Sequence, residues 1–354
     1  MESPTNFLTL HRDPLRHQYL PNNQSREPLF DPITKAWIIT NPSHCKELMA
    51  SSNLRPGTSA CAEDYKALEG RLGFDFSNLT FAFNHIPLCL HGDPHVRARR
   101  RMSEFLATRK AVLSARIPLA VATHFDVMRR EGRVEIMKEA VVPLALDIFS
   151  ALVDIDISGV ECTSLSVAFD KSISINKRRR VAAEIAKLRE LISCHLGPEA
   201  TEEDVGLRLA LLVLGRDPFI GTLGESLYRL LAANSGGRLL DISFPDLPPE
   251  TGVPVVERVV VSPFKLGGCD FAVGDRVRIL LQSFAYVDEP RIRTSFFGGG
   301  AHTCLGRPVS IDVWKALTAL LCAVPLRATV LSYATRDTDY VFTCPEHLEV
   351  ELRQ

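Results

Sequence analysis

The sequence has 354 residues, a formal net charge of −1 and a hydrophobic fraction of 46%. This length fits one large domain with a sizeable core, and a charge so near zero gives no support to nucleic-acid binding. The polar start and the lack of a long apolar run predict neither a signal peptide nor a membrane span. Nine irregularly spaced cysteines indicate neither a zinc site nor a disulfide framework, so we expect a cytoplasmic protein.

The first predicted elements are a strand at 36–40 and a helix that starts after Asn41, with Pro42 in its first turn. A mixed, glycine-containing region follows at 61–90. Its aromatic residues either line a ligand pocket or belong to an ordinary core; they are Phe74, Phe76, Phe81 and Phe83.

A further helix is predicted to begin at Pro94, because aspartate caps helices and proline is tolerated in the first turn. His95 and Arg99 then lie four residues apart on one helical face. The same helix carries a basic run, which on its own indicates a solvated face: Arg97, Arg100, Arg101, Arg109 and Lys110.

The middle of the chain is predicted to be helical. Apolar periodicity favours a pair of helices at 113–153 and two more at 158–195, around a basic run at 177–180 that is either a solvated loop or a basic rim. The segment 202–233 reads as one long apolar helix. The segment 244–250 is too rich in proline to form a regular helix.

One short stretch near the C-terminus carries the strongest chemical signal. Residues 297–306 fit the pattern F-x-x-G-x-H-x-C-x-G, in which the matched residues are Phe297, Gly300, His302, Cys304 and Gly306. Glycines let a backbone turn tightly, and a cysteine thiolate is a strong metal ligand. The alternative is a glycine-rich turn around a buried free cysteine, and five matched positions in ten residues argue against it.

This pattern resembles the heme-binding loop of the cytochrome P-450 family, and the resemblance extends from about residue 31 to the end. It implies a mainly α fold with a small β lobe (α+β). The whole chain, 1–354, would be a single heme-thiolate domain. Its parts would be a β-containing N-terminal part at 31–60, a helical core at 91–233, and a ligand loop with a C-terminal helix at 296–324.

The resemblance also implies a site. Heme b would be the cofactor, Cys304 its axial ligand, and Phe297 a shield for the sulfur. Gly300 and Gly306 would let the loop approach the porphyrin. The heme propionates would be held by basic residues at matching positions, namely His95, Arg99, Arg258 and His302. The basic run of the helix at 94 would then dock a ferredoxin or flavodoxin-type electron donor.

The sequence departs from the family's pattern at the distal helix. The family has a glycine, an acid and a threonine there; Gly215 and Asp217 match, but Pro218 replaces the threonine and its hydroxyl. Asp217 is predicted to relay protons, and Arg216 to hold a substrate carboxylate as in fatty-acid peroxygenases. The alternative is that Arg216 and Asp217 pair with each other. The family's E-x-x-R helix is missing, and its proximal loop is reduced to 282–295.

The function implied is a monooxygenase that oxidises a small organic molecule with dioxygen. The proline at 218 keeps open a peroxide-using peroxygenase or a redox-neutral dehydratase or isomerase. The missing E-x-x-R keeps open a non-catalytic heme protein.

Overall fold

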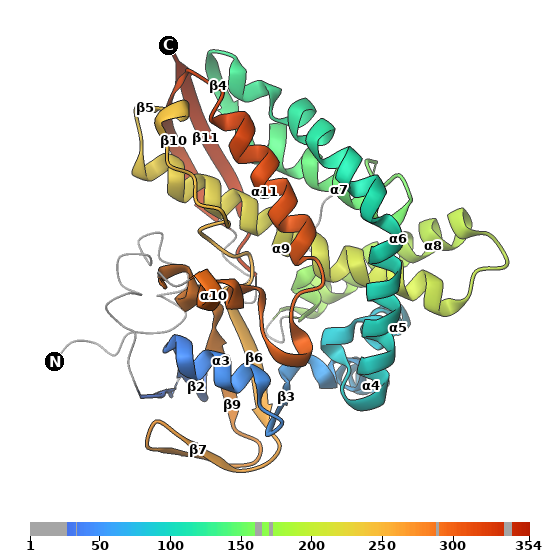
Figure 1. Ribbon diagram of the computed structural model, residues 1–354. Coiled ribbons are helices and arrows are strands. Elements are labelled where there is room, and N and C mark those ends of the chain that lie inside the picture. The colour runs from blue at the N-terminus through green and yellow to red at the C-terminus, as the bar shows by residue number, and fades with distance from the viewer. Residues whose placement is uncertain (1–26, 33, 160–164, 170–172, 288–289, 336–341) are drawn as a thin grey trace.

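The computed structural model describes residues 27–32, 34–159, 165–169, 173–287, 290–335 and 342–354. Most of the described chain is helical, and three small sheets complete the fold (Figure 1). The helices are α3 (Pro42–Ala50), α4 (Cys61–Leu72), α5 (Ser77–His85), α6 (Gly92–His124), α7 (Val142–Val153), α8 (Ile175–Leu196), α9 (Glu202–Ala233), α10 (Pro290–Arg293) and α11 (Arg307–Leu321). The strands are β1 (Leu29–Asp31), β2 (Ala36–Ile39), β3 (Leu54–Pro56), β4 (Gly132–Glu135), β5 (Gly237–Arg238), β6 (Val255–Val260), β7 (Phe264–Leu266), β8 (Cys269–Phe271), β9 (Arg276–Leu280), β10 (Arg327–Thr335) and β11 (Pro345–Arg353).

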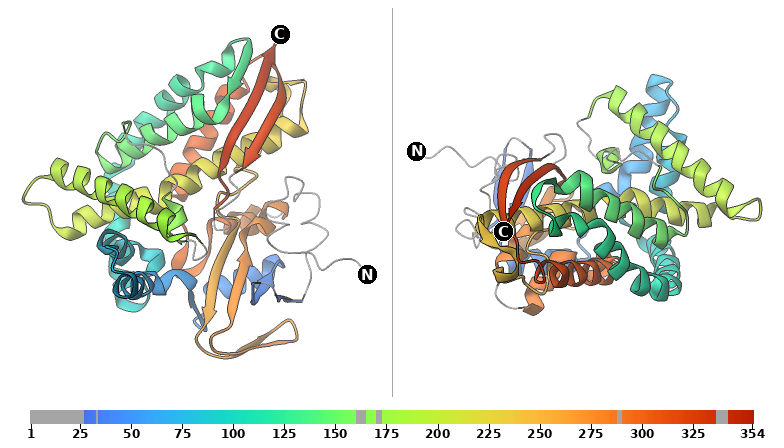
Figure 2. Two further views of the ribbon diagram at one scale, coloured as in Figure 1. Left: turned by 180° about the vertical axis from the view of Figure 1, so that it is seen from behind. Right: turned by 90° about the horizontal axis from the view of Figure 1, so that it is seen from above.

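The strands form one five-stranded sheet, one four-stranded sheet and a hairpin. The first has the order β1-β2-β9-β6-β3, with β2 and β9 parallel, and the second has the order β4-β11-β10-β5. Figures 1 and 2 show the two larger sheets on opposite sides of α9, which crosses the middle of the molecule. The main hydrophobic core surrounds α9, and a smaller core fills the space between the five-stranded sheet and α3. The predicted class, mainly α with a small β lobe, is confirmed.

The long apolar helix is found at the predicted residues, as α9. It begins with a capping box, in which the Asp204 amide donates to Thr201 Oγ1 at 3.2 Å and the Asp204 carboxylate accepts from the Thr201 amide. Its middle section is buried on most sides, which explains why its sequence is apolar almost all round. The helix α9 is therefore the central helix of the fold, and the main hydrophobic core packs around it.

Three predictions in the helical region are wrong in detail. The helix α6 begins at Gly92 with His91 as its N-cap, so Asp93 lies inside the first turn, where its charge favours the helix dipole. The same helix continues without a break to residue 124, whereas a separate helix was expected from 113. In the region 158–195, the described residues contain one α-helix, α8, whose first turns include the basic run at 177–180.

The proline-rich segment at 244–250 is not helical, as predicted. One face of α9 holds the chain at this point, through residues spaced by four and three positions. The Gly252 amide donates to Thr222 Oγ1 at 2.9 Å, and the Glu250 amide donates to Ser226 Oγ at 3.2 Å. Arg229 pairs with Glu250 at 2.8 Å. A polar stripe on α9 therefore secures the segment in which the sequence lacks the expected E-x-x-R helix.

The four phenylalanines at 74–83 belong to the core. Phe76 and Phe83 are fully buried, and Phe83 stacks against Tyr65. Phe74 and Phe81 are half-buried beneath arginines of α8. None of the four is among the described residues that line the central cavity.

Candidate functional site

The stretch 297–306 folds into a compact loop that leads into α11. The Cys304 amide donates to the Phe297 carbonyl at 2.8 Å, which closes the loop. Gly298 and Gly300 have φ values of 84° and 58°, which are strained for any residue with a Cβ. A Cβ on Gly300 would also lie 2.8 Å from the Met49 carbonyl oxygen. The glycines are thus required both for the turn and for its close packing against α3.

The Cys304 thiol opens into a cavity of about 310 Å³. Its enclosure by protein raises the pKa of the Cys304 thiol, whereas the backbone amides of Gly306 and Arg307 and the charges of Arg99 and Arg307 act to lower it. The amides belong to the N-cap residue and the first residue of α11, and a helix N-terminus favours a thiolate. The sulfur is therefore placed to become a thiolate when a metal ion binds it.

Four basic side chains converge beside this loop. The rings of His95 and His302 have centroids 4.3 Å apart, and Arg99 Nη2 donates to the Thr303 carbonyl at 2.8 Å. Burial lowers the pKa of Arg258 to about 10. Burial, followed by the positive charges of its basic neighbours, lowers the pKa of His302 to about 3. The nearby arginines disfavour the charged forms of the two histidines, and an anion bound among these groups would act in the opposite direction.

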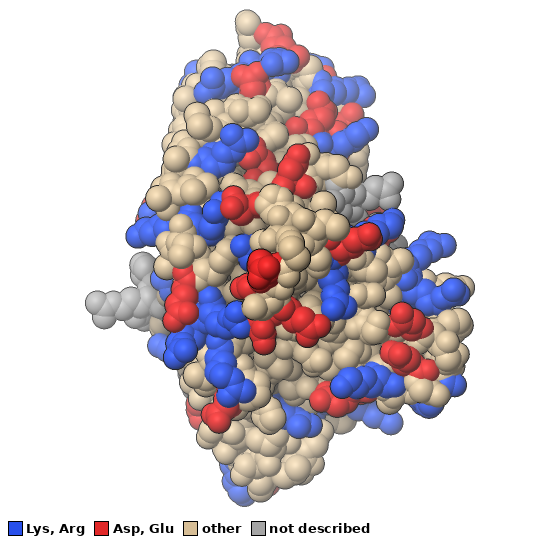
Figure 3. Space-filling model, turned by 90° about the vertical axis from the view of Figure 1, so that its right-hand side faces the viewer, with Lys and Arg blue, Asp and Glu red and all other residues tan. Residues whose placement is uncertain are grey.

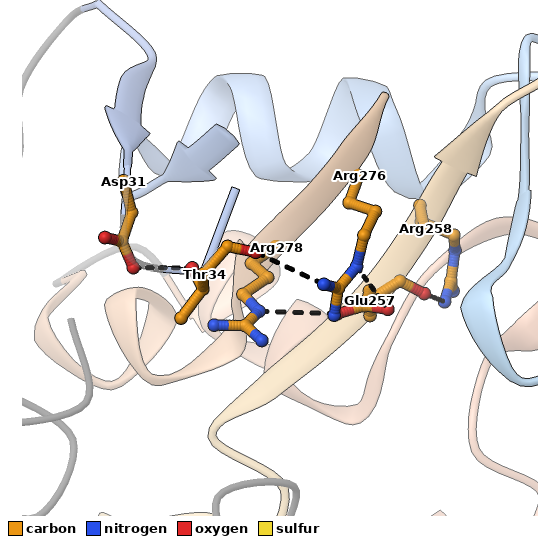
Figure 4. Close-up of polar contacts among 6 residues, drawn as sticks. All are labelled: Asp31, Thr34, Glu257, Arg258, Arg276 and Arg278. Atoms are coloured by element: carbon orange, nitrogen blue, oxygen red, sulfur yellow. Dashed lines mark hydrogen bonds and ion pairs between the residues drawn. The ribbon is translucent and has the colours of Figure 1, made fainter. Parts of the chain in front are cut away.

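An acid lies close to Arg258, but its carboxylate is engaged elsewhere. Figure 4 shows Glu257 on β6 between Arg258 and two arginines of β9. The Glu257 carboxylate accepts from Arg276 Nη2 at 2.6 Å and from Arg278 Nε at 3.3 Å. Arg258 donates instead to the Glu257 backbone carbonyl at 3.0 Å. Neighbouring strand residues point in opposite directions, so the Glu257 carboxylate turns toward Arg276 and Arg278 and not toward the Arg258 guanidinium.

Figure 4 also shows how the network reaches the first strands, because Arg276 Nη1 donates to the Thr34 carbonyl at 3.2 Å. Glu257 and Arg278 line the cavity, yet sequence reasoning missed both. They are directly paired across β6 and β9. The only signal was the alternation of charged and apolar residues on two strands whose pairing the sequence does not reveal.

The distal wall of the cavity is formed by α9. Gly215, Pro218 and Thr222 line it. Pro218 has no amide hydrogen, so the Leu214 carbonyl lacks its usual helical donor. Thr222 Oγ1 donates to the Pro218 carbonyl at 2.7 Å and accepts from the Gly252 amide at 2.9 Å. The hydroxyl hydrogen of Thr222, the threonine of α9 near Pro218, is therefore already donated to a group of the protein.

Arg216 and Asp217 lie beside this wall. Both are almost fully buried, and Arg216 Nε is 3.2 Å from Asp217 Oδ1. The second carboxylate oxygen, Oδ2, accepts from the Ser166 amide at 3.0 Å. Neither side chain is among the described residues that line the cavity. Their catalytic roles stay a prediction.

The remaining predicted residues are distributed as follows. Phe297 lines the cavity and packs against Phe296, with ring centroids 4.2 Å apart. Arg99, Arg258, His302, Cys304 and Gly306 also line the cavity. His95 lies behind His302, and its buried Nε2 has no hydrogen-bond partner within the described ranges. A buried polar atom without a partner requires an explanation, such as a missing ligand.

The basic run of α6 is partly neutralised by acids. Arg100 pairs with Glu104, Arg101 lies 3.6 Å from Asp204, and Arg109 pairs with Asp154 at 2.9 Å. Figure 3, which shows the side of the molecule that carries α6 and α8, has charges of both signs interspersed over most of its area. The run is therefore at least in part an ordinary solvated face.

The residues at the cavity fit a heme. The thiol faces the cavity, as an axial ligand must, and the adjoining basic cluster suits two propionates. The unpartnered Nε2 of His95 gives a second reason to expect an anionic or hydrogen-bonding group there.

Comparison with known proteins identifies the fold. No protein-family model matches the sequence, and no curated protein matches it significantly. Among solved structures, CalO2 matches with a TM-score of 0.78 at 18% identity, over 99% of this chain and 98% of its own. The cytochrome P450 PksS of Bacillus subtilis 168 matches with a TM-score of 0.72 at 18% identity, over 98% of this chain and 99% of its own. P450BioI was solved in complex with hexadec-9Z-enoic acid ligated acyl carrier protein. It matches with a TM-score of 0.69 at 16% identity, over 95% of this chain and 99% of its own.

The chain therefore has the cytochrome P450 fold, formed with a non-helical segment at 244–250. Within the described ranges, every helix is too short or too polar to span a bilayer.

Proposed function

We propose that this protein is a heme-thiolate oxidoreductase that acts as a monooxygenase on a small organic molecule. One observation carries the proposal: the Cys304 thiol opens into a largely apolar cavity beside four converging basic side chains. A thiolate suits heme iron and the basic cluster suits the two heme propionates, so the two features are explained by one ligand.

Each residue of the site has a role in this proposal. The Cys304 thiolate would bind the heme iron, Phe297 would shield the sulfur from water, and Gly300 and Gly306 would let the loop lie close to the porphyrin. A bound thiolate-ligated heme would supply an electron-rich iron that favours O–O bond cleavage. The groups that hold the propionates are those of the basic cluster, namely His95, Arg99, Arg258 and His302.

The cavity wall favours a neutral, apolar substrate. Two of its hydroxyl groups are already bonded to backbone, since Thr58 Oγ1 donates to the Leu88 carbonyl at 2.6 Å and Thr222 Oγ1 to that of Pro218. Arg216, the predicted holder of a substrate carboxylate, is paired with Asp217. The apolar side chains of the wall include Phe149, Leu152, Phe169, Leu211, Leu214 and Phe342.

Electrons would come from a ferredoxin or flavodoxin-type donor. Acidic donors are steered by cations, and Arg97 and Lys110 of the α6 basic run are candidates for that contact. A second function is favoured by a specific observation at the distal wall. Pro218 has no hydroxyl, and the Thr222 hydroxyl already donates its hydrogen to the Pro218 carbonyl. A distal wall without a free hydroxyl donor from these two residues suits an enzyme that uses hydrogen peroxide directly.

The test begins with heme incorporation. The reduced protein with carbon monoxide should show the long-wavelength absorption typical of thiolate-bound heme. Cys304→Ala should abolish it, and Cys322→Ala, which alters an exposed cysteine after α11, should not. An unchanged spectrum in Cys304→Ala would exclude the proposed ligand.

Turnover then separates the two functions. A panel of neutral apolar compounds is supplied either with dioxygen, NAD(P)H, a reductase and a ferredoxin, or with hydrogen peroxide alone. Product with the first set only supports the monooxygenase. Product with peroxide at least as fast supports the peroxygenase. Oxidation in neither set, despite a normal spectrum, would refute both.

A further inference from the structure

A short buried segment between α7 and α8 forms part of the cavity wall. Residues Ser166–Phe169 make one 3₁₀ turn, and all four are buried. The last of them, Phe169, lines the cavity. The centroid of its ring lies 5.2 Å from that of Phe83 and 6.0 Å from that of Phe342, and both contacts are edge to face. The position of this turn therefore determines where one aromatic wall of the cavity stands.

The turn is held from the α9 side by Asp217. The Ser166 amide donates to Asp217 Oδ2 at 3.0 Å, and Arg216 Nε contacts Asp217 Oδ1 at 3.2 Å. Taking a carboxylate out of water is costly unless it is paired and hydrogen-bonded. Here each oxygen has a donor. The charge of Arg216 thus stabilises the carboxylate that holds the turn.

The same turn is held from the opposite side by α4. Tyr65 Oη donates to the Ala168 carbonyl at 3.0 Å, and Arg178 Nη1 of α8 donates to Tyr65 Oη at 3.1 Å. The Arg178 guanidinium also lies over the Tyr65 ring, 5.4 Å from its centroid. One hydrogen bond thus secures the start of the turn and another secures its end.

We propose that Asp217, stabilised by Arg216, is a positioning residue that fixes the Ser166–Phe169 turn and with it the Phe169 wall of the cavity. A proton-transferring group must come within hydrogen-bond reach of the reacting atom. Asp217 instead uses both oxygens inside the protein and lies behind the described lining residues. The effect on substrate choice rests on the proposed function; the contact between Asp217 and the turn does not.

The first measurement needs no heme chemistry. Amide hydrogen exchange of residues 165–169 is followed in the full-length protein and in Asp217→Ala, Asp217→Asn and Tyr65→Phe. Asp217→Ala should speed exchange about tenfold or more, as expected for the loss of a hydrogen bond to a charged group. Asp217→Asn should restore part of the protection, because its single amide oxygen can still accept from the Ser166 amide, although its NH2 group then faces the donor Arg216 Nε. Exchange in Asp217→Ala equal to that of the natural protein would overturn the proposal.

The second measurement uses the heme-loaded protein and the spectral shift that an azole causes on binding. Asp217→Ala and Phe169→Ala should each change the affinity for a bulky apolar azole severalfold while leaving that for imidazole unchanged. Asp217→Asn, which keeps one of the two acceptor oxygens, should lie between Asp217→Ala and the natural protein. If Asp217→Asn and Asp217→Ala bind both azoles normally but lose turnover equally, with a larger solvent isotope effect, Asp217 is a proton donor and the proposal is wrong.

Tyr65→Phe keeps the proposal testable if Asp217→Ala fails to fold. It removes the second hydrogen bond to the same turn and should speed exchange in residues 165–169 and alter bulky-azole affinity. Unchanged exchange in Tyr65→Phe, with the natural azole affinities, would count against the proposal. The two proposals can also fail separately. If Asp217→Ala speeds exchange but the natural protein lacks the thiolate spectrum, the positioning role of Asp217 stands and only the heme function is refuted.

Discussion

His302 makes the stability of the heme-free protein depend on pH. Burial and the nearby positive charges lower the pKa of His302 from 6.5 to about 3 in the folded chain. The unfolded chain therefore binds more protons between pH 6.5 and about 3, so folding stability falls as the pH drops through this window. The gap between the two pKa values corresponds to at most about 5 kcal/mol, and partial exposure of the ring reduces this to a few kcal/mol.

The assay is urea unfolding at several pH values between about 4 and 7, with and without heme. His302→Gln keeps a hydrogen-bonding side chain but cannot titrate, so its heme-free stability should fall less on acidification than that of the natural protein. His195→Gln, at an exposed site on α8, is the control and should follow the natural protein. Propionates beside His302 would favour its charged form, so heme should flatten the natural curve. Superimposed heme-free curves for His302→Gln and the natural protein would refute the reasoning.

Arg258→Met should weaken heme binding by about 1.5–3 kcal/mol, measured by heme transfer to apomyoglobin, without destabilising the heme-free protein. Gly300→Ala should cost about 1–3 kcal/mol in urea unfolding and reduce heme retention, because φ is 58° and the Met49 carbonyl is too close. Thr222→Val should cost about 1–3 kcal/mol, since it leaves the Gly252 amide without its acceptor. Pro218→Thr should raise the fraction of reductant that ends in product; an unchanged fraction would mean that this position does not serve oxygen chemistry.

The sequence was sufficient where the signal is local. The motif at 297–306 depends on glycines and a cysteine within ten residues, and the structure places that cysteine at the cavity. The helix α9 is long and apolar, and its apolar pattern was enough to predict the bounds 202–233. The start of α6 was misjudged by two residues because Asp93 and Gly92 are both acceptable near a helix start, and only the backbone decides between them.

Contacts between residues far apart in the chain could not be predicted from the sequence. Glu257 and Arg278 lie 21 positions apart and meet only because β6 and β9 pair in one particular register. The stripe of α9 that holds the segment at 244–250 is regular along the helix, but its partners come from a chain segment with no periodicity. The neighbours Arg216 and Asp217 could be predicted to pair, whereas the Ser166 amide, 51 residues away, could not be foreseen as a third partner.

These contacts together determine where protons can come from during the proposed reaction. On the distal wall, Pro218 has no hydroxyl, the Thr222 hydrogen points to a carbonyl, and Asp217 holds the Ser166–Phe169 turn. A proton donor must nevertheless reach the reacting oxygen. The Leu214 carbonyl, which lacks its helical donor because of Pro218, can orient a water molecule or a substrate hydroxyl beside the wall. Proton supply would then depend on what fills the cavity, and a substrate with its own hydroxyl should couple oxidation to reductant better than a matched hydrocarbon.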